Sequence, residues 1–252
     1  MTSGSLEDVA ALNRRFSGAD PAEVLGYAAA HWNERLAVAC SLGVEDVVIL
    51  QLLSGLPPAA DAVRVFTLDT GRLHEETYDL LDRLRTRYAR PIALYFPEAT
   101  LVERLVRDGG PRSFLTSVDE RKKCCAVRKL GPLARALDGA DAWVTGLRRG
   151  QSSARAETDL FELDAANGGR VKVSPLAGWS EEQVWSYVRE HDVPYNALHD
   201  AGYPSIGCAP CTRAVAPGED PRGGRWWWET MEEGRECGLH SPRRPKQPHA
   251  SG

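Results

Sequence analysis

Two pairs of cysteines carry the clearest chemical signal in this chain of 252 residues. Cys124 and Cys125 are adjacent in RKKCCAVRKL, and Cys208 and Cys211 form a C-x-x-C in GYPSIGCAPCTR. A disulfide between the adjacent thiols is disfavoured, because neighbouring Cα atoms lie about 3.8 Å apart and an unstrained bridge spans roughly 4.4–6.8 Å. The adjacent thiols are therefore inert, paired with something distant, or ligands of a metal centre.

The spacing of these four thiols favours an iron–sulfur cluster over a single ion. Zinc sites with four cysteines usually take their ligands from two C-x₂₋₄-C pairs. Adjacent ligands suit one tetrahedral ion poorly, because successive side chains on a helix diverge by about 100°. A 4Fe–4S cluster offers a separate iron to each thiolate. We therefore expect one such cluster per chain, with zinc, a redox-active C-x-x-C and buried free thiols as the alternatives.

Positive charge gathers locally, although the formal net charge of the chain is −4. Basic residues concentrate at 121–129, 148–155, 213–225 and 235–246. A net acidic chain argues against a general nucleic-acid binder, so the clusters indicate a local anion site, with solvated surface charge as the alternative. The first cluster surrounds the adjacent cysteines and would offset the negative charge of thiolates.

A fifth thiol, Cys237, lies in EEGRECGLH, between Arg235 and His240. A cationic setting lowers the pKa of a thiol and populates the nucleophilic thiolate, so Cys237 is a candidate nucleophile. The alternative is an exposed cysteine without a role. The sixth thiol, Cys40, lies in the apolar run RLAVACSLG and is predicted to belong to the core.

The composition is typical of a globular protein, with 42% hydrophobic and 26% charged residues. The first residues show no basic leader followed by an apolar core, and no apolar run approaches the length of a membrane span. Six cysteines without an export signal favour reduced thiols, metal binding or catalysis over structural disulfides. We expect a cytoplasmic protein that binds neither membranes nor nucleic acid.

Apolar strands alternate with helical stretches along most of the chain. Strands are expected within 35–43, 62–73, 91–99 and 141–150, with a further short strand near Val171 and a helix entered at residues 180–182. This alternation predicts an α/β fold with a parallel twisted sheet and flanking helices, whose ligands bind at the carboxyl ends of the strands. Those ends carry Ser41, Gly43, Asp69, Thr70, Gly146 and Arg148.

The expected organisation is one α/β domain and a tail. Residues 1–215 form the domain, with 1–30 as a helical lead-in. Residues 216–252 are rich in Gly, Pro and Arg and lack periodicity, which predicts a mobile C-terminal tail that carries Cys237.

Several segments, in order over roughly residues 35–241, resemble the assimilatory adenylyl-sulfate (APS) reductases, which belong to the phosphoadenylyl-sulfate (PAPS) reductase family. The segments are CSLGVEDVV, FTLDTGRLHEETYDL, KKCCAVRKLGPLARAL, TGLRRGQSSAR, GYPSIGCAPCT, GRWWWE and ECGLH. The combination of KKCC, IGCAPCT and ECGLH is highly specific. The resemblance implies an adenine nucleotide alpha hydrolase-like fold, related to the PP-loop pyrophosphatases, for the nucleotide-binding domain.

The resemblance also implies an activity, namely reduction of APS to sulfite and AMP with thioredoxin as the electron donor. The matching nucleophile is Cys237, which would form a cysteine S-sulfonate. The matching ligands of the 4Fe–4S cluster are Cys124, Cys125, Cys208 and Cys211. The role implied for the cluster is structural and electrostatic.

Substrate contacts are likewise implied by the resemblance. Lys129 would link substrate and cluster, and His240 would lie near the nucleophile. The nucleotide and its anionic groups would be held by Ser41, Gly43, Asp46, Leu68, Thr70, Arg155, Arg222 and Arg225. The loop CSLGVED departs from the Ser-x-Ser-Gly loops of many relatives, and Leu42 cannot donate a side-chain hydrogen bond.

Simpler roles remain for several of these residues, and other functions remain for the chain. Asp46 could cap its helix, Arg222 and Arg225 could be solvated tail charges, and His240 could be a spectator. PAPS could be the substrate, or both sulfonucleotides. An ATP pyrophosphatase would need an SGGxDS-type loop, and a non-enzymatic iron–sulfur sensor would leave Cys237 without a role. A homo-oligomer is compatible with the sequence.

Overall fold

The computed structural model describes residues 6–229 and 238–239. Within this part of the chain, six strands form one sheet in the order β3-β2-β1-β4-β6-β5. The strands are β1 (Leu36–Ala39), β2 (Arg64–Leu68), β3 (Ile92–Tyr95), β4 (Ala142–Val144), β5 (Phe161–Asp164) and β6 (Arg170–Val173). Every neighbouring pair is parallel except β5 and β6, which are antiparallel. The predicted α/β fold is confirmed, and the structure adds an antiparallel edge strand to it.

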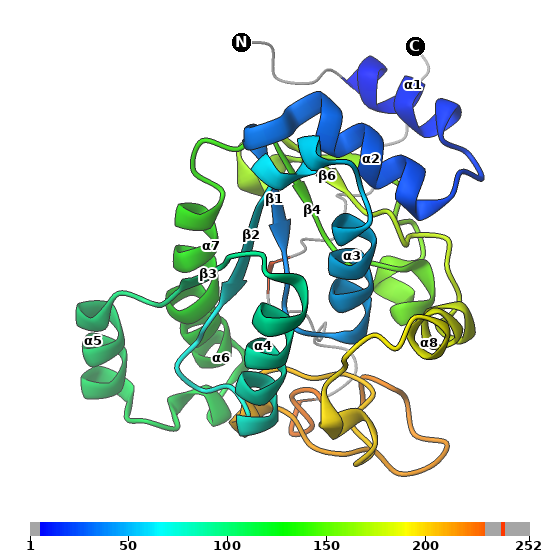
Figure 1. The fold of residues 1–252 in the computed structure, drawn as a ribbon. Helices are drawn as coiled ribbons and strands as arrows, with labels where there is room; N and C mark the ends of the chain where they lie inside the picture. Colours follow the sequence, from blue (N-terminus) through cyan, green and yellow to red (C-terminus); the bar gives the residue numbers. More distant parts are fainter. Residues whose placement is uncertain (1–5, 230–237, 240–252) are drawn as a thin grey trace, which may run out of the picture.

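Eight α-helices flank the sheet in the described residues (Figure 1). They are α1 (Leu6–Arg15), α2 (Pro21–Trp32), α3 (Val44–Ser54), α4 (Glu75–Tyr88), α5 (Ala99–Gly109), α6 (Val118–Cys125), α7 (Gly131–Ala136) and α8 (Glu181–Glu190). Polar side chains fix several helix starts, because they accept hydrogen bonds from backbone N–H groups that have no partner within the helix. Asp20 caps α2, Ser117 caps α6, and Ser180 forms a capping box with Gln183 on α8.

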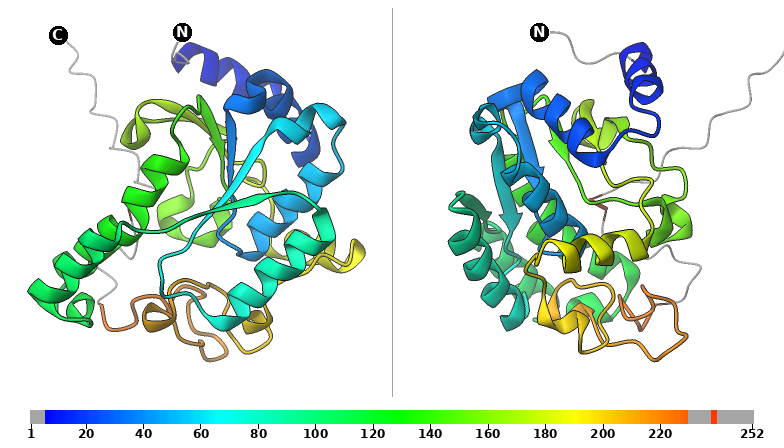
Figure 2. Two further views of the ribbon diagram at one scale, coloured as in Figure 1. Left: turned by 60° about the vertical axis from the view of Figure 1, so that its left-hand side comes forward. Right: turned by 45° about the vertical axis from the view of Figure 1, so that its right-hand side comes forward.

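Helices cover both faces of the sheet (Figure 2), and the alternation of side chains along the strands divides the core between these faces. Leu36 and Val38 of β1 pack on the face covered by α2, α3, α4 and α8. Ala37, between them, packs on the opposite face with Trp143 of β4 and with α7. Because helices cover both faces, the parallel strands carry runs of apolar residues on both sides.

The carboxyl ends of the parallel strands all lie at one edge of the fold. Residues 196–229 form a largely loop-like layer at this edge, below the sheet in Figure 1. Helix α6 ends at Cys125 and continues into a π-helical turn, η4 (Ala126–Leu130), before α7 begins. A π turn re-aims the side chains that follow it and is frequent at functional sites. No helix in the described ranges is long and apolar enough to cross a membrane.

Candidate functional site

A cavity of about 250 Å³ opens at the carboxyl ends of β1, β2 and β4. The predicted nucleotide-contacting residues that lie in the described part of the chain all line it, as does Lys129. They are Ser41, Gly43, Asp46, Leu68, Thr70, Arg155, Arg222 and Arg225. They come from three strand ends, from the turn after α6 and from the C-terminal layer. The fold therefore brings together residues that lie up to 184 positions apart, from Ser41 to Arg225.

Hydrogen bonds to Asp46 close the loop between β1 and α3. Its Oδ2 accepts hydrogen bonds from the Ser41 backbone N–H at 2.7 Å and from the Ser41 hydroxyl at 2.5 Å. Burial raises the pKa of Asp46 to about 6, although the hydrogen bonds from Ser41 oppose this shift. Leu42, at the tip, has φ +66°, a left-handed conformation that is uncommon for a non-glycine residue. The Ser41 hydroxyl thus serves the loop itself, and the Asp46 carboxylate closes the loop instead of capping α3.

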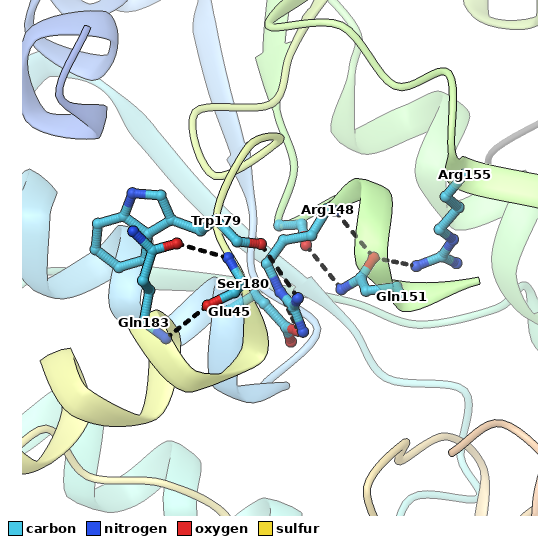
Figure 3. A network of polar contacts seen from close by, with 8 residues as sticks. Glu45, Arg148, Gln151, Arg155, Trp179, Ser180 and Gln183 are labelled. Atoms are coloured by element: carbon cyan, nitrogen blue, oxygen red, sulfur yellow. Dashed lines mark hydrogen bonds and ion pairs between the residues drawn. The ribbon is translucent and has the colours of Figure 1, made fainter. Parts of the chain in front are cut away.

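A second network joins this loop to the residues after β4 (Figure 3). Arg148 donates from Nε and Nη2 to Oε1 of Glu45, at 3.0 and 2.7 Å. The Gln151 Oε1 accepts from the Arg148 backbone N–H at 3.1 Å and from Arg155 Nη1 at 2.6 Å, and its Nε2 donates to the Gly146 carbonyl at 3.0 Å. Hydrogen bonds therefore tie this wall of the cavity together, and the charge of Arg148 is balanced by a carboxylate.

The four predicted ligand cysteines line a second, small cavity beside the first. Cys124 and Cys125 end α6, Cys208 is the N-cap of the short turn η9 (Ala209–Cys211), and Cys211 is the last residue of that turn. All four are buried and carry free thiols. Over residues 6–229 and 238–239, no group of three or more His, Cys, Asp or Glu side chains is arranged as a metal-ion site.

Residues of the nucleotide cavity also contact these thiols. The Thr70 hydroxyl lies 3.3 Å from Cys208 Sγ, and Arg128 Nη1 donates to the Thr70 carbonyl at 2.7 Å. Burial alone would raise the pKa of Cys208, but Lys129, the Thr70 hydroxyl and nearby arginines together lower it. Burial, followed by the charge of Cys208, raises the pKa of Cys211 to about 12. Thr70 and Lys129 therefore connect the two cavities.

Three buried nitrogen atoms near the thiols lack a hydrogen-bond partner in the described structure. They are Nε of Arg128, Nε of Arg225 and Nε1 of Trp228. Buried donors without an acceptor are rare and costly, so each needs an explanation. Four thiols around one cavity, surrounded by donors and cations, fit a group that carries its own acceptor sulfur atoms.

The C-terminal candidates are only partly covered. Cys237 and His240 lie outside the described residues. Leu239, two positions after Cys237 in the sequence, lines the nucleotide cavity and packs against apolar residues of the sheet. Residues 216–229, the first part of the expected tail, include the buried side chains of Arg225, Trp226 and Glu229.

Sequence reasoning did not identify several residues that build these cavities. Glu45, Gln151 and Glu229 were not singled out, because a carboxylate or amide that supports an arginine leaves no local pattern. Arg128 was visible only as one member of a basic cluster. The signal for all four is spatial, since their partners lie between 3 and 108 positions away.

Comparisons with known proteins find similar sequences and a similar structure. An adenosine 5'-phosphosulfate reductase of Allochromatium vinosum is 50% identical over 220 residues, which cover 86% of this chain and 83% of the relative. A protein of the same name from Burkholderia cepacia is 48% identical over 210 residues, which cover 82% of this chain and 81% of the relative.

A crystal structure of phosphoadenylyl-sulfate (PAPS) reductase from Candida auris superimposes with a TM-score of 0.72 at 28% identity, covering 85% of this chain and 99% of that one. Residues 35–214 match the phosphoadenosine phosphosulfate reductase domain. That match covers both cysteine pairs and most of the nucleotide cavity. On this evidence, the chain belongs to the phosphoadenosine phosphosulfate reductase family.

Proposed function

We propose that this protein reduces adenosine 5'-phosphosulfate to sulfite and AMP in sulfate assimilation, with a thioredoxin-type dithiol protein as the electron donor. The relatives at about 50% identity carry the name of this activity. The observation that supports it most directly is the pairing of a cation-lined cavity at the strand ends with a cavity lined by four thiols. Thr70, Lys129 and Arg225 line the first cavity, and each also lowers the pKa of Cys208 in the second.

The proposed reaction needs one thiolate outside the cluster and one external dithiol. The Cys237 thiolate attacks the sulfate sulfur of APS, an S–S bond forms, and the bond from sulfur to the phosphate oxygen breaks, so that AMP leaves with its electron pair. A thiolate of the donor then attacks Cys237 Sγ, and sulfite leaves with the electrons of the S–S bond. The second donor thiol closes a disulfide on the donor and regenerates Cys237. The position of Leu239 in the cavity supports the placement of this chemistry.

The described cations would do the electrostatic work of the first step. A thiolate approaching a phosphosulfate brings two negative groups together, so preorganised positive charge must stabilise the leaving phosphate. Within the described residues, Arg225 donates hydrogen bonds to a carbonyl and a hydroxyl. Arg128 donates a hydrogen bond to a carbonyl. Neither charge is cancelled by a carboxylate in these bonds.

A 4Fe–4S cluster would be held by Cys124, Cys125, Cys208 and Cys211. When bound, it would supply a structural crosslink between α6 and η9 and a local charge beside the nucleotide cavity. The buried donors described above support a sulfur-rich occupant over a bare zinc ion. Iron, sulfide and zinc counts on anaerobically purified protein test this assignment, and stoichiometric zinc would overturn it.

The central experiment compares APS and PAPS as substrates of the full chain with a reduced thioredoxin. We expect sulfite and AMP from APS, and a single added SO₃ on Cys237 by mass spectrometry when the donor is omitted. Cys237→Ser should abolish both signals while iron content and melting temperature stay unchanged. Release from PAPS at an equal rate would instead establish dual specificity, and no adduct with either substrate would refute the proposal.

Lys129→Ala provides a second test, within the described residues. Lys129 lines both cavities and lowers the pKa of Cys208, so its removal takes charge from the site without removing a ligand. We expect iron content to persist and turnover to fall by about 100-fold, the scale reported for loss of one transition-state donor. Unchanged kinetics would remove Lys129 from the mechanism.

A further inference from the structure

An ion pair between Arg121 and Glu229 lies inside the protein, although 108 positions separate the two residues. Arg121 on α6 donates from Nε and Nη2 to the two carboxylate oxygens of Glu229, each at 2.8 Å. The side chains are only 1% and 2% exposed. Two charges withdrawn this completely from water are tolerated only with good geometry, and removal of one partner leaves the other uncompensated.

The ring of Trp226 lies beside this pair and contacts two guanidinium groups. The Arg121 Cζ atom lies 4.6 Å from the ring centroid, and the Arg225 Cζ atom lies 4.8 Å from it. Both distances are within the range of cation–π attraction. Trp226 is 1% exposed and has φ +45°, a conformation that a bulky residue keeps only where its surroundings hold it. Its backbone N–H donates to the Cys211 carbonyl at 3.1 Å.

Arg225 is held at the other end of this arrangement. Its Nη1 donates to the Ile206 carbonyl at 3.0 Å and to the Ser205 hydroxyl at 3.3 Å. The guanidinium packs so closely on Gly207 that a Cβ atom there would collide with it. Arg225 lines the nucleotide cavity, Arg121 lines the cysteine cavity, and Trp226 lines both. Direct contacts thus run without a gap from Glu229 through Arg121 and Trp226 to Arg225.

We propose that Glu229 and Arg121 are positioning residues that fix Arg225 in the nucleotide cavity through the ring of Trp226. The buried ion pair holds the Arg121 guanidinium on the ring, the ring holds its strained backbone turn, and the turn places Arg225 against Gly207. Anion binding in one cavity therefore depends on a charge pair at the edge of the other. The inference rests on the proposed function only in taking an adenine nucleotide as the ligand.

A double-mutant cycle with AMP as the probe tests this coupling. Affinity is measured by calorimetry on the anaerobically purified full chain for the wild type, Glu229→Gln, Arg225→Met and the double variant. We expect Glu229→Gln to weaken AMP binding about 10-fold in the wild-type background, within the range of measured site-to-site couplings. In the Arg225→Met background the same change should cost less than about 2-fold, because the residue it positions is gone.

Two further variants locate the effect. Glu162→Gln breaks another largely buried ion pair, with side chains 9% and 11% exposed, in which Lys172 Nζ and Glu162 Oε2 lie 3.2 Å apart between β5 and β6. Neither residue lines either cavity, so AMP affinity should not change. Gly207→Ala displaces the Arg225 guanidinium directly and should reproduce the loss seen in Arg225→Met, again without additivity with Glu229→Gln.

Equal weakening by Glu229→Gln in both backgrounds would overturn the inference, as would no weakening in either. If Glu229→Gln does not fold, Trp226→Phe replaces it in the same cycle, because phenylalanine keeps the packing and reduces the cation–π attraction. Additivity of Trp226→Phe with Arg225→Met would be equally decisive against the proposal. The proposed function fails separately, as absence of sulfite release from APS while the AMP measurements still report the coupling.

Discussion

The arginines at the two ends of the nucleotide cavity have different hydrogen-bond partners. At the end formed by the loops after β1 and β4, Arg148 is 5% exposed and gives two hydrogen bonds to the Glu45 carboxylate. At the end next to the cysteines, Arg225 is 7% exposed and donates hydrogen bonds to the Ile206 carbonyl and the Ser205 hydroxyl. Burial is similar, but only the first charge is cancelled by a neighbour. At the first end the charge of Arg148 is thus cancelled, whereas at the second end Arg225 retains positive charge for an anion.

This difference predicts the orientation of a bound nucleotide. The anionic part of an adenine nucleotide should lie at the cysteine end, because an uncancelled cation in a partly desolvated site attracts anions more strongly than an ion pair does. The nucleoside would then extend toward the loop between β1 and α3, where Ser41 bonds to Asp46. In APS the group nearest the thiols would be the phosphosulfate, as the proposed chemistry requires.

The first predicted effect is on nucleotide affinity. Arg225→Met removes one uncancelled charge and should weaken AMP binding by about 30-fold, which corresponds to roughly 2 kcal/mol for a lost charge-assisted contact. The double change Glu45→Gln with Arg148→Met removes two charges that already cancel, so it should change affinity less than about 3-fold. Calorimetry at two salt concentrations measures both, and only Arg225→Met should reduce the salt dependence. Comparable losses in the two variants would show that the two ends do not differ.

The second predicted effect is on stability. Here loss of Arg148 should have the larger effect and loss of Arg225 the smaller one. Arg148→Met alone leaves the Glu45 carboxylate, 15% exposed, without its cation and should lower the free energy of unfolding by about 3 kcal/mol. Adding Glu45→Gln should recover most of that loss, since both charges are then gone. Arg225→Met leaves no carboxylate unpaired and should cost less than Arg148→Met. Urea unfolding measures all three, and a double variant no more stable than Arg148→Met would contradict the pairing.

How far the sequence could predict this site depends on whether the signal is local. The cysteine pairs, the strand ends and the basic clusters are contiguous motifs, and Cys124, Cys125, Cys208 and Cys211 line one cavity. The antiparallel strand β5 was not anticipated, because four residues of FELD between turns resemble a loop as much as a strand. The side-chain amide of Asn13 makes two hydrogen bonds to the backbone of Phe161 in this strand. Its Nδ2 donates to the Phe161 carbonyl, and its Oδ1 accepts from the Phe161 N–H.

The supporting pairs could not be predicted for a different reason. Glu229 follows three tryptophans in a Gly- and Arg-rich stretch, which composition alone assigns to a solvated tail. Its buried partner, Arg121, is one of several bases in RKKCCAVRKL, and no feature marks it and Arg128 as the two that are buried. Which base is buried depends on the packing of Trp226, and that is a property of the assembled fold.

A third predicted effect concerns pH and the end formed by the loops after β1 and β4. Burial raises the pKa of Asp46 from 3.8 to about 6, so its proton is held more tightly in the folded protein than in the unfolded one. A group of this kind contributes stability that is fully present below about pH 4 and is lost as the pH rises through about 6. We therefore compare unfolding free energies of the wild type and Asp46→Asn between pH 4 and 7.5.

The wild type should lose stability relative to Asp46→Asn over this range, by at most roughly 3 kcal/mol for a shift of about two pKa units. Above pH 7 the difference should level off, because the carboxylate is then ionised in both states. A difference that is flat from pH 4 upward would mean that the hydrogen bonds from Ser41 fully offset the burial of Asp46. The cysteine end offers no carboxylate of this kind among its described cavity-lining residues, so titration in this window should distinguish the two ends again.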